Sequence, residues 1–123
     1  MRLRFIFESI TLFAVLNDTP TSRKLIKALP AESTIHMWGE EVYFAVPVKT
    51  ALEEEAKQVV DPGTVCFWVE GSSLAIPFGP TPVSKAGECR LVTRVNILGK
   101  LEGDPNLLKS VREGEHVRIE LAA

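Results

Sequence analysis

The chain has 123 residues, of which 46% are hydrophobic and 24% are charged, and its formal net charge is −2. This composition is typical of a globular protein, and the length predicts that residues 1–123 form one domain with one core. The sequence has no basic run or stripe, which argues against a nucleic-acid partner, and no apolar run approaches the roughly 18 residues of a membrane-spanning helix.

The first residues and the cysteines bear on cellular location. The segment 2–8 alternates polar and apolar residues and lacks the longer apolar region of a secretory signal. Cys66 and Cys89 lie far apart in strand-like surroundings, without a C-x-x-C spacing. We therefore expect both to be small buried hydrophobic residues in a reducing compartment, and we expect a cytoplasmic protein.

Short alternating segments separated by Gly, Pro and Asp predict a mainly β protein, either a sandwich or a closed barrel. The eight predicted strands are 2–8, 10–16, 32–38, 41–46, 64–69, 74–78, 90–98 and 115–121. One helix is predicted to begin after Thr19, a capping residue followed by Pro20, and to end near Pro30. A second short helix is expected at 105–111. Residues 51–60 are compatible with a helical turn or with an extended loop.

The clearest local prediction is a hairpin around the Gly-Glu pair at 39–40. This pair matches a two-residue type II′ loop, which would pair His36 with Tyr43 and Met37 with Val42. Because side chains alternate along a strand, the two strands then have two distinct faces. One face is wholly apolar, and we expect it to pack into the core: Ile35, Met37, Val42 and Phe44.

The opposite face of this hairpin carries the leading candidates for a functional site: His36, Trp38, Glu41 and Tyr43. This face combines two large aromatic rings with an imidazole and a carboxylate, which is unusual for a surface that only has to be soluble. Exposed aromatic residues are enriched at binding sites. The alternative is that the helix or a loop covers this face, so that Trp38 is merely packed and His36 and Tyr43 are satisfied locally.

The segment from Leu74 to Pro82 is the most unusual of the chain, because an apolar strand runs into three prolines around one glycine. Proline has no N–H to donate, so the segment is predicted to lie at a sheet edge, a bulge or a rim. The N–H groups of Phe78, Gly79 and Thr81 would then lack ladder partners, and the segment would form a binding lip. An exposed edge at Pro77 would also allow a homodimer.

Arg94 is a further candidate, because Arg94 and Asn96 share one side of the predicted strand 90–98 and could donate to a carbonyl or carboxylate at the lip. An ordinary surface arginine is the alternative. The residues on the other side of this strand are expected to face the core: Leu91, Thr93, Val95 and Ile97.

Catalytic and metal-binding signatures are absent from the sequence. There are two histidines and no carboxylates clustered at ligand spacing, so we expect no metal site and no cofactor. There is no G-x-S-x-G elbow, and the apolar run around Cys66 predicts an inert thiol. No catalytic residue is therefore assigned.

Four motifs taken together resemble a small prokaryotic cyclophilin-like family. They are Trp38-Gly39-Glu40-Glu41-Val42-Tyr43-Phe44, Asp61-Pro62-Gly63-Thr64-Val65, Phe78-Gly79-Pro80-Thr81-Pro82 and Asn96-Ile97-Leu98-Gly99-Lys100. The resemblance covers essentially the whole chain and implies a closed eight-stranded antiparallel β-barrel with one or two short capping helices. Cyclophilins isomerise X-Pro bonds with an arginine on the hairpin strand, and the comparable segment here has His36 and Trp38 but no arginine.

The expected function is therefore the binding of a peptide segment or a small molecule in a groove on the outer face of the barrel. The candidate residues of this groove are His36, Trp38, Tyr43, Phe78, Thr81 and Arg94. A weak peptidyl-prolyl isomerase is one alternative. A subunit of an amide-hydrolysing enzyme, a role that the resemblance to related barrels implies, is another.

Overall fold

The structure is a computed structural model, and it describes residues 1–122. Its elements are β1 (Arg2–Phe7), β2 (Thr11–Leu16), α1 (Pro20–Lys27), β3 (Ala31–Thr34), β4 (His36–Met37), β5 (Glu41–Ala45), β6 (Lys57–Val60), β7 (Thr64–Trp68), β8 (Ser73–Pro77), β9 (Cys89–Leu101), the 3₁₀ helix η1 (Pro105–Ser110) and β10 (His116–Leu121). Within this described part of the chain, no helix is long and apolar enough to cross a membrane.

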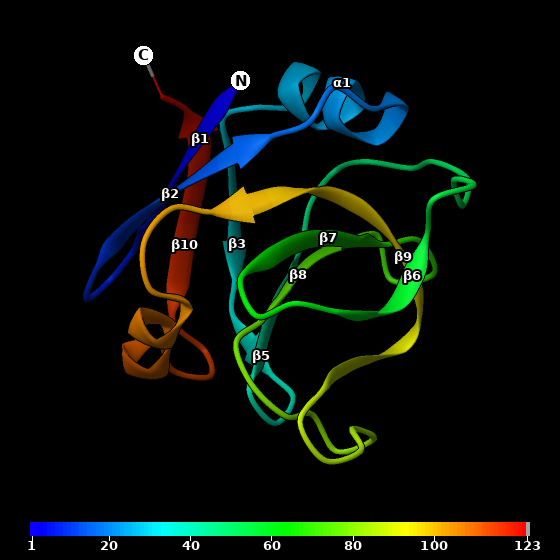
Figure 1. The fold of residues 1–123 in the computed structure, drawn as a ribbon. Helices are drawn as coiled ribbons and strands as arrows, with labels where there is room; N and C mark the ends of the chain where they lie inside the picture. The colour runs from blue at the N-terminus through cyan, green and yellow to red at the C-terminus, as the bar shows by residue number, and fades with distance from the viewer. Residues whose placement is uncertain (123) are drawn as a thin grey trace.

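Nine strands follow one another around a nearly closed antiparallel barrel, in the order β3-β10-β1-β2-β9-β7-β8-β5-β4, and β6 pairs with β9 off this path. β3 and β4 stand at the two ends of this order, yet only Ile35 separates them in the chain. One extended segment therefore pairs with β10 through its first half and with β5 through its second half, which brings the ends of the sheet together (Figure 1).

The predicted strand count needs correction. The strand expected at 32–38 is divided at Ile35, because the N–H of Ile35 donates to the carbonyl of Glu115 at 2.8 Å while the next two residues pair with β5. Residues 57–60, left open between a helical turn and a loop, form strand β6. Within residues 1–122 the barrel thus has nine strands, with β6 paired to β9 beside it, and is nearly closed, rather than eight strands and fully closed.

The two short helices lie toward opposite ends of the barrel, α1 near the chain termini and η1 at the far end of β10 (Figure 1). Thr19 caps α1, since its Oγ1 accepts a hydrogen bond from the N–H of Ser22 at 3.0 Å. Asp104 caps η1 in the same way. Leu25 of α1 and Leu108 of η1 are fully buried in the barrel core, which confirms the predicted capping helices.

The apolar side chains form two clusters on the two faces of the same strands. The larger cluster fills the barrel and includes Phe5, Phe44 and Phe67, which are at most 1% exposed. The smaller cluster lies on the outer face of β7 and β8: Cys66, Ala75, Leu91 and Val95, with Tyr43 and Trp68 packed against them. This part of the sheet is therefore covered on both faces, and its outer face is partly shielded from solvent.

The core face predicted for β9 is wrong, and β9 also contains a bulge near its end. Val65 pairs with Gly99 whereas Cys66 pairs with Ile97, so Leu98 is an extra residue in the ladder and the alternation changes there. Leu98 consequently packs in the barrel core. The residues expected in that core pack instead on the outer face of the sheet: Leu91, Val95 and Ile97.

Candidate functional site

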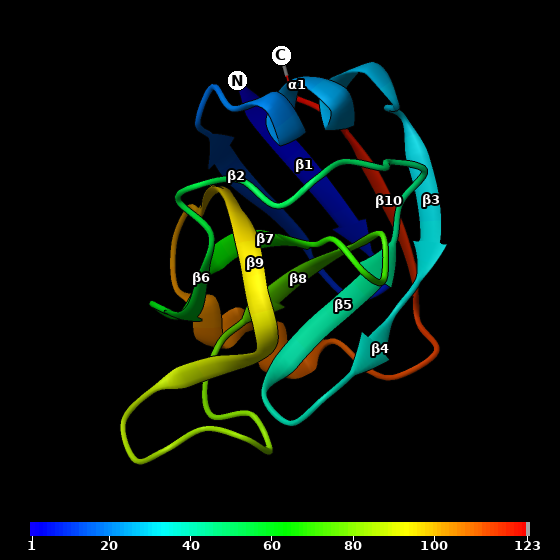
Figure 2. The same cartoon turned by 90° about the vertical axis from the view of Figure 1, so that its right-hand side faces the viewer.

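A pocket of about 180 Å³ lies on the outer face of the barrel. β9 curls across the outer face of β7 and β8 (Figure 2), and three residues of its first half line the pocket. The lining residues come from the β4–β5 hairpin, β7, β8 and β9: Trp38, Glu41, Tyr43, Trp68, Ala75, Leu91, Val92 and Val95.

The β4–β5 hairpin has the predicted register, with His36 opposite Tyr43 and Met37 opposite Val42. Gly39 has a φ of +59°, and Ser72 is the one non-glycine residue with a positive φ within residues 1–122, so the loop has the φ signs of a type II′ turn. Three of the four predicted core residues are fully buried, Ile35, Val42 and Phe44, and the fourth, Met37, is partly buried and packs against the core. The opposite face of the hairpin therefore points out of the barrel, as expected.

Aromatic rings form the walls of the pocket on the hairpin side. The rings of Tyr43 and Trp68 have centroids 6.1 Å apart and planes at 89°, so they form a corner. His36 stacks on Tyr43 at 5.3 Å, and its Nδ1 lies 3.1 Å from Oε2 of Glu113. The indole of Trp68 rests against Gly71, where an added Cβ would lie 2.8 Å from its Cδ2 atom. The two rings are thus held in place from outside the pocket.

Glu41 supplies the charge of the pocket. Its side chain is only 5% exposed, and within residues 1–122 its Oε1 atom is buried without a hydrogen-bond partner. Burial raises the pKa of this carboxyl to about 7, because the charged form loses its hydration. A buried carboxyl without a partner is costly to the fold, so its position in a cavity wall makes Glu41 a candidate site residue.

The structure brings together two of the six predicted site residues. Trp38 and Tyr43 line the pocket, whereas His36 is exposed and contacts Tyr43 from outside. The alternative prediction, that another part of the chain covers the outer face of the hairpin, is correct in part. The covering element is strand β9 rather than the helix or a loop.

The proline-rich segment does not line this pocket, although its Gly79 and Pro80 line a separate, larger groove. Phe78 is 7% exposed and packs in the barrel core, and its N–H donates to the carbonyl of Glu40 at 2.8 Å. The N–H of Thr81 donates to Oγ of Ser84 at 2.9 Å, and its hydroxyl donates to the carbonyl of Arg90. Two of the three N–H groups that were expected to be free, those of Phe78 and Thr81, are therefore used. The side chains of both residues lie outside the pocket.

The prediction of a sheet edge at this segment is also corrected. β8 lies between β5 and β7, and Pro77, its last residue, pairs with Glu41. The carbonyl of Pro77 accepts the N–H of Gly63 at 2.7 Å. The later prolines follow the strand end and pack on the hairpin, since a Cβ at Gly39 would lie 3.0 Å from the carbonyl oxygen of Pro80. β8 thus offers no free edge for a second copy.

The side chains of Arg94 and Asn96 bind partners outside the pocket. Arg94 is exposed, and its Nε and Nη2 atoms lie 3.4 Å from the carbonyl oxygen of Ala56. Asn96 is fully buried, and its Nδ2 atom donates to Thr21 Oγ1 and to the carbonyl of Ala51, both at 3.0 Å. Asn96 therefore ties α1 and the 49–56 loop to β9, and neither residue reaches the pocket.

The cysteines match the sequence prediction of inert buried thiols. Cys66 and Cys89 are both buried and unbonded to each other, and burial raises the pKa of each thiol. Among the described residues, no three His, Cys, Asp or Glu side chains lie close enough together to hold a metal ion.

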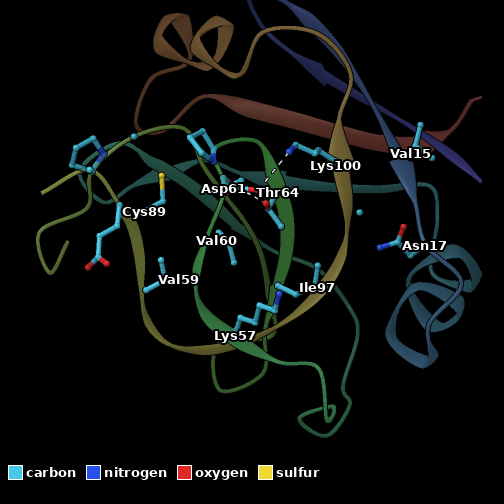
Figure 3. A pocket seen from close by; sticks show the side chains of 16 residues that line it. Val15, Asn17, Lys57, Val59, Val60, Asp61, Thr64, Cys89, Ile97 and Lys100 are labelled. Atoms are coloured by element: carbon cyan, nitrogen blue, oxygen red, sulfur yellow. Dashed lines mark hydrogen bonds and ion pairs between the residues drawn. The ribbon is translucent and has the colours of Figure 1, made fainter. Parts of the chain in front are cut away.

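A larger open groove of about 820 Å³ runs along β6 and β9 (Figure 3). Its charged side chains are of mixed sign: Lys57, Asp61, Glu88 and Lys100. Nζ of Lys100 lies 4.0 Å from Oδ2 of Asp61, and both side chains are largely exposed. Ion pairs between solvent-exposed charges contribute little free energy. This groove also contains none of the six predicted site residues. The smaller pocket, with its buried charge and aromatic walls, is therefore the better candidate site.

Several pocket residues escaped the sequence interpretation. Glu41 was placed on the correct face, but nothing in the chain indicated that β9 would bury it. Trp68 could have been found from alternation, because it lies two residues from the outward-facing Cys66. The walls supplied by Leu91 and Val92 depend on the curl of β9, which no local pattern encodes.

Together the fold and the pocket define an antiparallel β-barrel with a sheltered site on its outer face. The chain belongs to the cyclophilin-like family, whose model matches residues 1–120. It is similar to the solution structure of the hypothetical protein AF2241 from Archaeoglobus fulgidus, at 38% identity over 99% of this chain and 95% of that chain, with a TM-score of 0.84. No curated protein matches it. The family resemblance seen in the four sequence motifs is confirmed.

Proposed function

We propose that this chain is a binding module whose outer-face pocket holds one side chain of a peptide, or one small molecule of similar size. The observation that carries the proposal is Glu41, whose Oε1 is buried without a partner in the described residues and lies in the wall of an aromatic pocket. Sites of this kind combine mostly apolar walls with a few polar groups that orient the ligand.

The size of the pocket sets the size of the ligand. At about 180 Å³ it is smaller than the roughly 300–1,000 Å³ of pockets that enclose a drug-sized molecule. It has room for about six water molecules, at roughly 30 Å³ each. A single side chain or a compact molecule of a few heavy atoms therefore fits, whereas a nucleotide does not.

Isomerase activity has less support than binding. Within residues 1–122, none of the pocket-lining residues is an arginine, and Arg94 directs its guanidinium to the carbonyl of Ala56. The hydrogen-bond donor that cyclophilins use is thus not replaced from another strand. The polar group that the pocket offers is a carboxyl, which favours recognition of a donor or a cation.

Intrinsic fluorescence tests the proposal, because both tryptophans of the chain line this pocket. We expect compact fragments or peptides to change the emission of Trp38 and Trp68. Val92→Phe should weaken that binding about tenfold, or about 1.4 kcal/mol, because the larger side chain fills the opening. Val92 is 54% exposed, so the change should leave the fold intact.

Val83→Phe is the matched control, since Val83 is 45% exposed and lies outside the pocket lining. This variant should bind every active fragment as the wild type does. Unchanged emission across broad fragment and peptide libraries would contradict the proposed function, as would equal weakening by the two valine substitutions.

A further inference from the structure

The pocket has one negative charge and no positive charge of its own. Its lining contains Glu41 and, within the described residues, neither lysine nor arginine. The cause of the raised pKa of Glu41 is burial alone, with no basic neighbour acting against it. A buried carboxylate is retained at low cost only when a cation or several donors compensate it, and the chain supplies neither here.

The walls around this carboxylate suit a cation as well. Tyr43 and Trp68 form a corner at 89°, and Trp38 flanks Glu41 on the hairpin. The faces of tryptophan and tyrosine rings attract ammonium groups, most strongly where water is excluded. The negative faces of the same rings disfavour an anion, which the charge of Glu41 would also repel.

The remaining walls define what the cationic group is attached to. Ala75, Leu91 and Val95 are at most 2% exposed and present aliphatic surface beside the aromatic corner. Such surface suits a chain of methylene groups. A metal ion is disfavoured, because within residues 1–122 no group of three His, Cys, Asp or Glu side chains could hold one together with Glu41.

From the function proposed above, we infer that the ligand group is an alkylammonium, such as the end of a lysine side chain or a small aliphatic amine, paired with Glu41 and enclosed by Trp38, Tyr43 and Trp68. The methylene stem lies against the β9 wall. Glu41 supplies the charge and the acceptor, and the rings replace the hydration of the cation.

Three probes with four carbon atoms each test this inference: n-butylammonium, 1-butanol and butyrate. Each is titrated into the wild-type protein at about pH 8, where Glu41 is mostly ionised, while the indole N–H signals of Trp38 and Trp68 are followed by NMR. We expect n-butylammonium to bind about tenfold more tightly than 1-butanol, and butyrate to bind least.

Glu41→Gln should remove this preference by weakening n-butylammonium about tenfold while leaving 1-butanol unchanged. Glu70→Gln is the matched control, because it removes the same charge from an exposed carboxylate two residues from Trp68. This control should leave both affinities unchanged. Val92→Phe, which blocks the opening without altering the charge, should weaken all probes alike.

Equal binding of n-butylammonium and 1-butanol to the wild type would overturn the alkylammonium inference and leave the binding function standing. An unchanged preference in Glu41→Gln would overturn it too. If none of the three probes moves the indole signals, the inference fails, and the fluorescence screen then decides the binding function separately.

Discussion

Glu41→Gln should make the protein more stable at about pH 8, by about 1–3 kcal/mol in the free energy of unfolding. Burial raises the pKa of this carboxyl from 4.5 to about 7, so the folded protein binds its proton more tightly than the unfolded chain does. The wild type therefore loses stability as the pH rises from 4.5 through 7, whereas the glutamine variant avoids this loss.

Urea unfolding at several pH values measures this difference. The gain from Glu41→Gln should be largest above pH 7 and should disappear below pH 4.5. Glu70→Gln, at an exposed carboxylate, should show no such pH dependence. A stability difference between Glu41→Gln and the wild type that stays constant with pH would contradict the assignment of an unpaired buried carboxyl.

Gly99→Ala should destabilise the barrel by about 4 kcal/mol or more, the range of a severe core change. Gly99 lies where β9 pairs with β2 on one side and β7 on the other. A Cβ there would overlap the backbone oxygen of Val15 and would lie 2.9 Å from Cα of Leu16. Because these are backbone atoms of a paired strand, they can move only if β2 and β9 separate.

Gly103→Ala separates this steric effect from the conformational preference of glycine. Gly103 has a φ of +81° and nothing within 4 Å of an added Cβ, so its replacement should cost only about 1–2 kcal/mol. Thermal or urea unfolding of both variants gives the comparison. A Gly99→Ala variant as stable as Gly103→Ala would contradict the close approach of β2 and β9.

Glu41→Gln is expected to raise the stability of the fold and to lower its affinity for the cation. Opposite effects on stability and binding are typical of a functional residue. The substitution should stabilise the fold and remove recognition of the cation. Natural proteins retain such destabilising groups where activity requires them. If the role of Glu41 were structural, the protein would instead become less stable when the charge of Glu41 is removed.

Local patterns in the sequence were sufficient for most of the fold. Gly39 determines the hairpin loop, and from it the register that places Trp38 and Tyr43 on the outer face follows directly. Thr19 and Asp104 are typical N-cap residues, and they predict where the two helices begin. These features depend on residues close together in the chain, so they could be predicted.

Features that depend on distant pairing could not be predicted. The bulge at Leu98 reverses the alternation of β9, and only the partner strand β7 reveals it. The burial of Glu41 in the pocket wall depends on β9, although 43 residues lie between the hairpin and β9 in the chain. The segment at 78–82 was predicted wrongly for the same reason, because two of its N–H groups, those of Phe78 and Thr81, find partners on Glu40 and Ser84.

The position of a bound n-butylammonium ion tests the central claim most directly. Intermolecular NOEs, or a crystal structure of the complex, would locate the ammonium group relative to the chain. We expect the nitrogen within hydrogen-bonding distance of Glu41, with the methylene protons close to the rings of Tyr43 and Trp68. Binding in the groove between Lys57 and Lys100, with the pocket empty, would contradict the account.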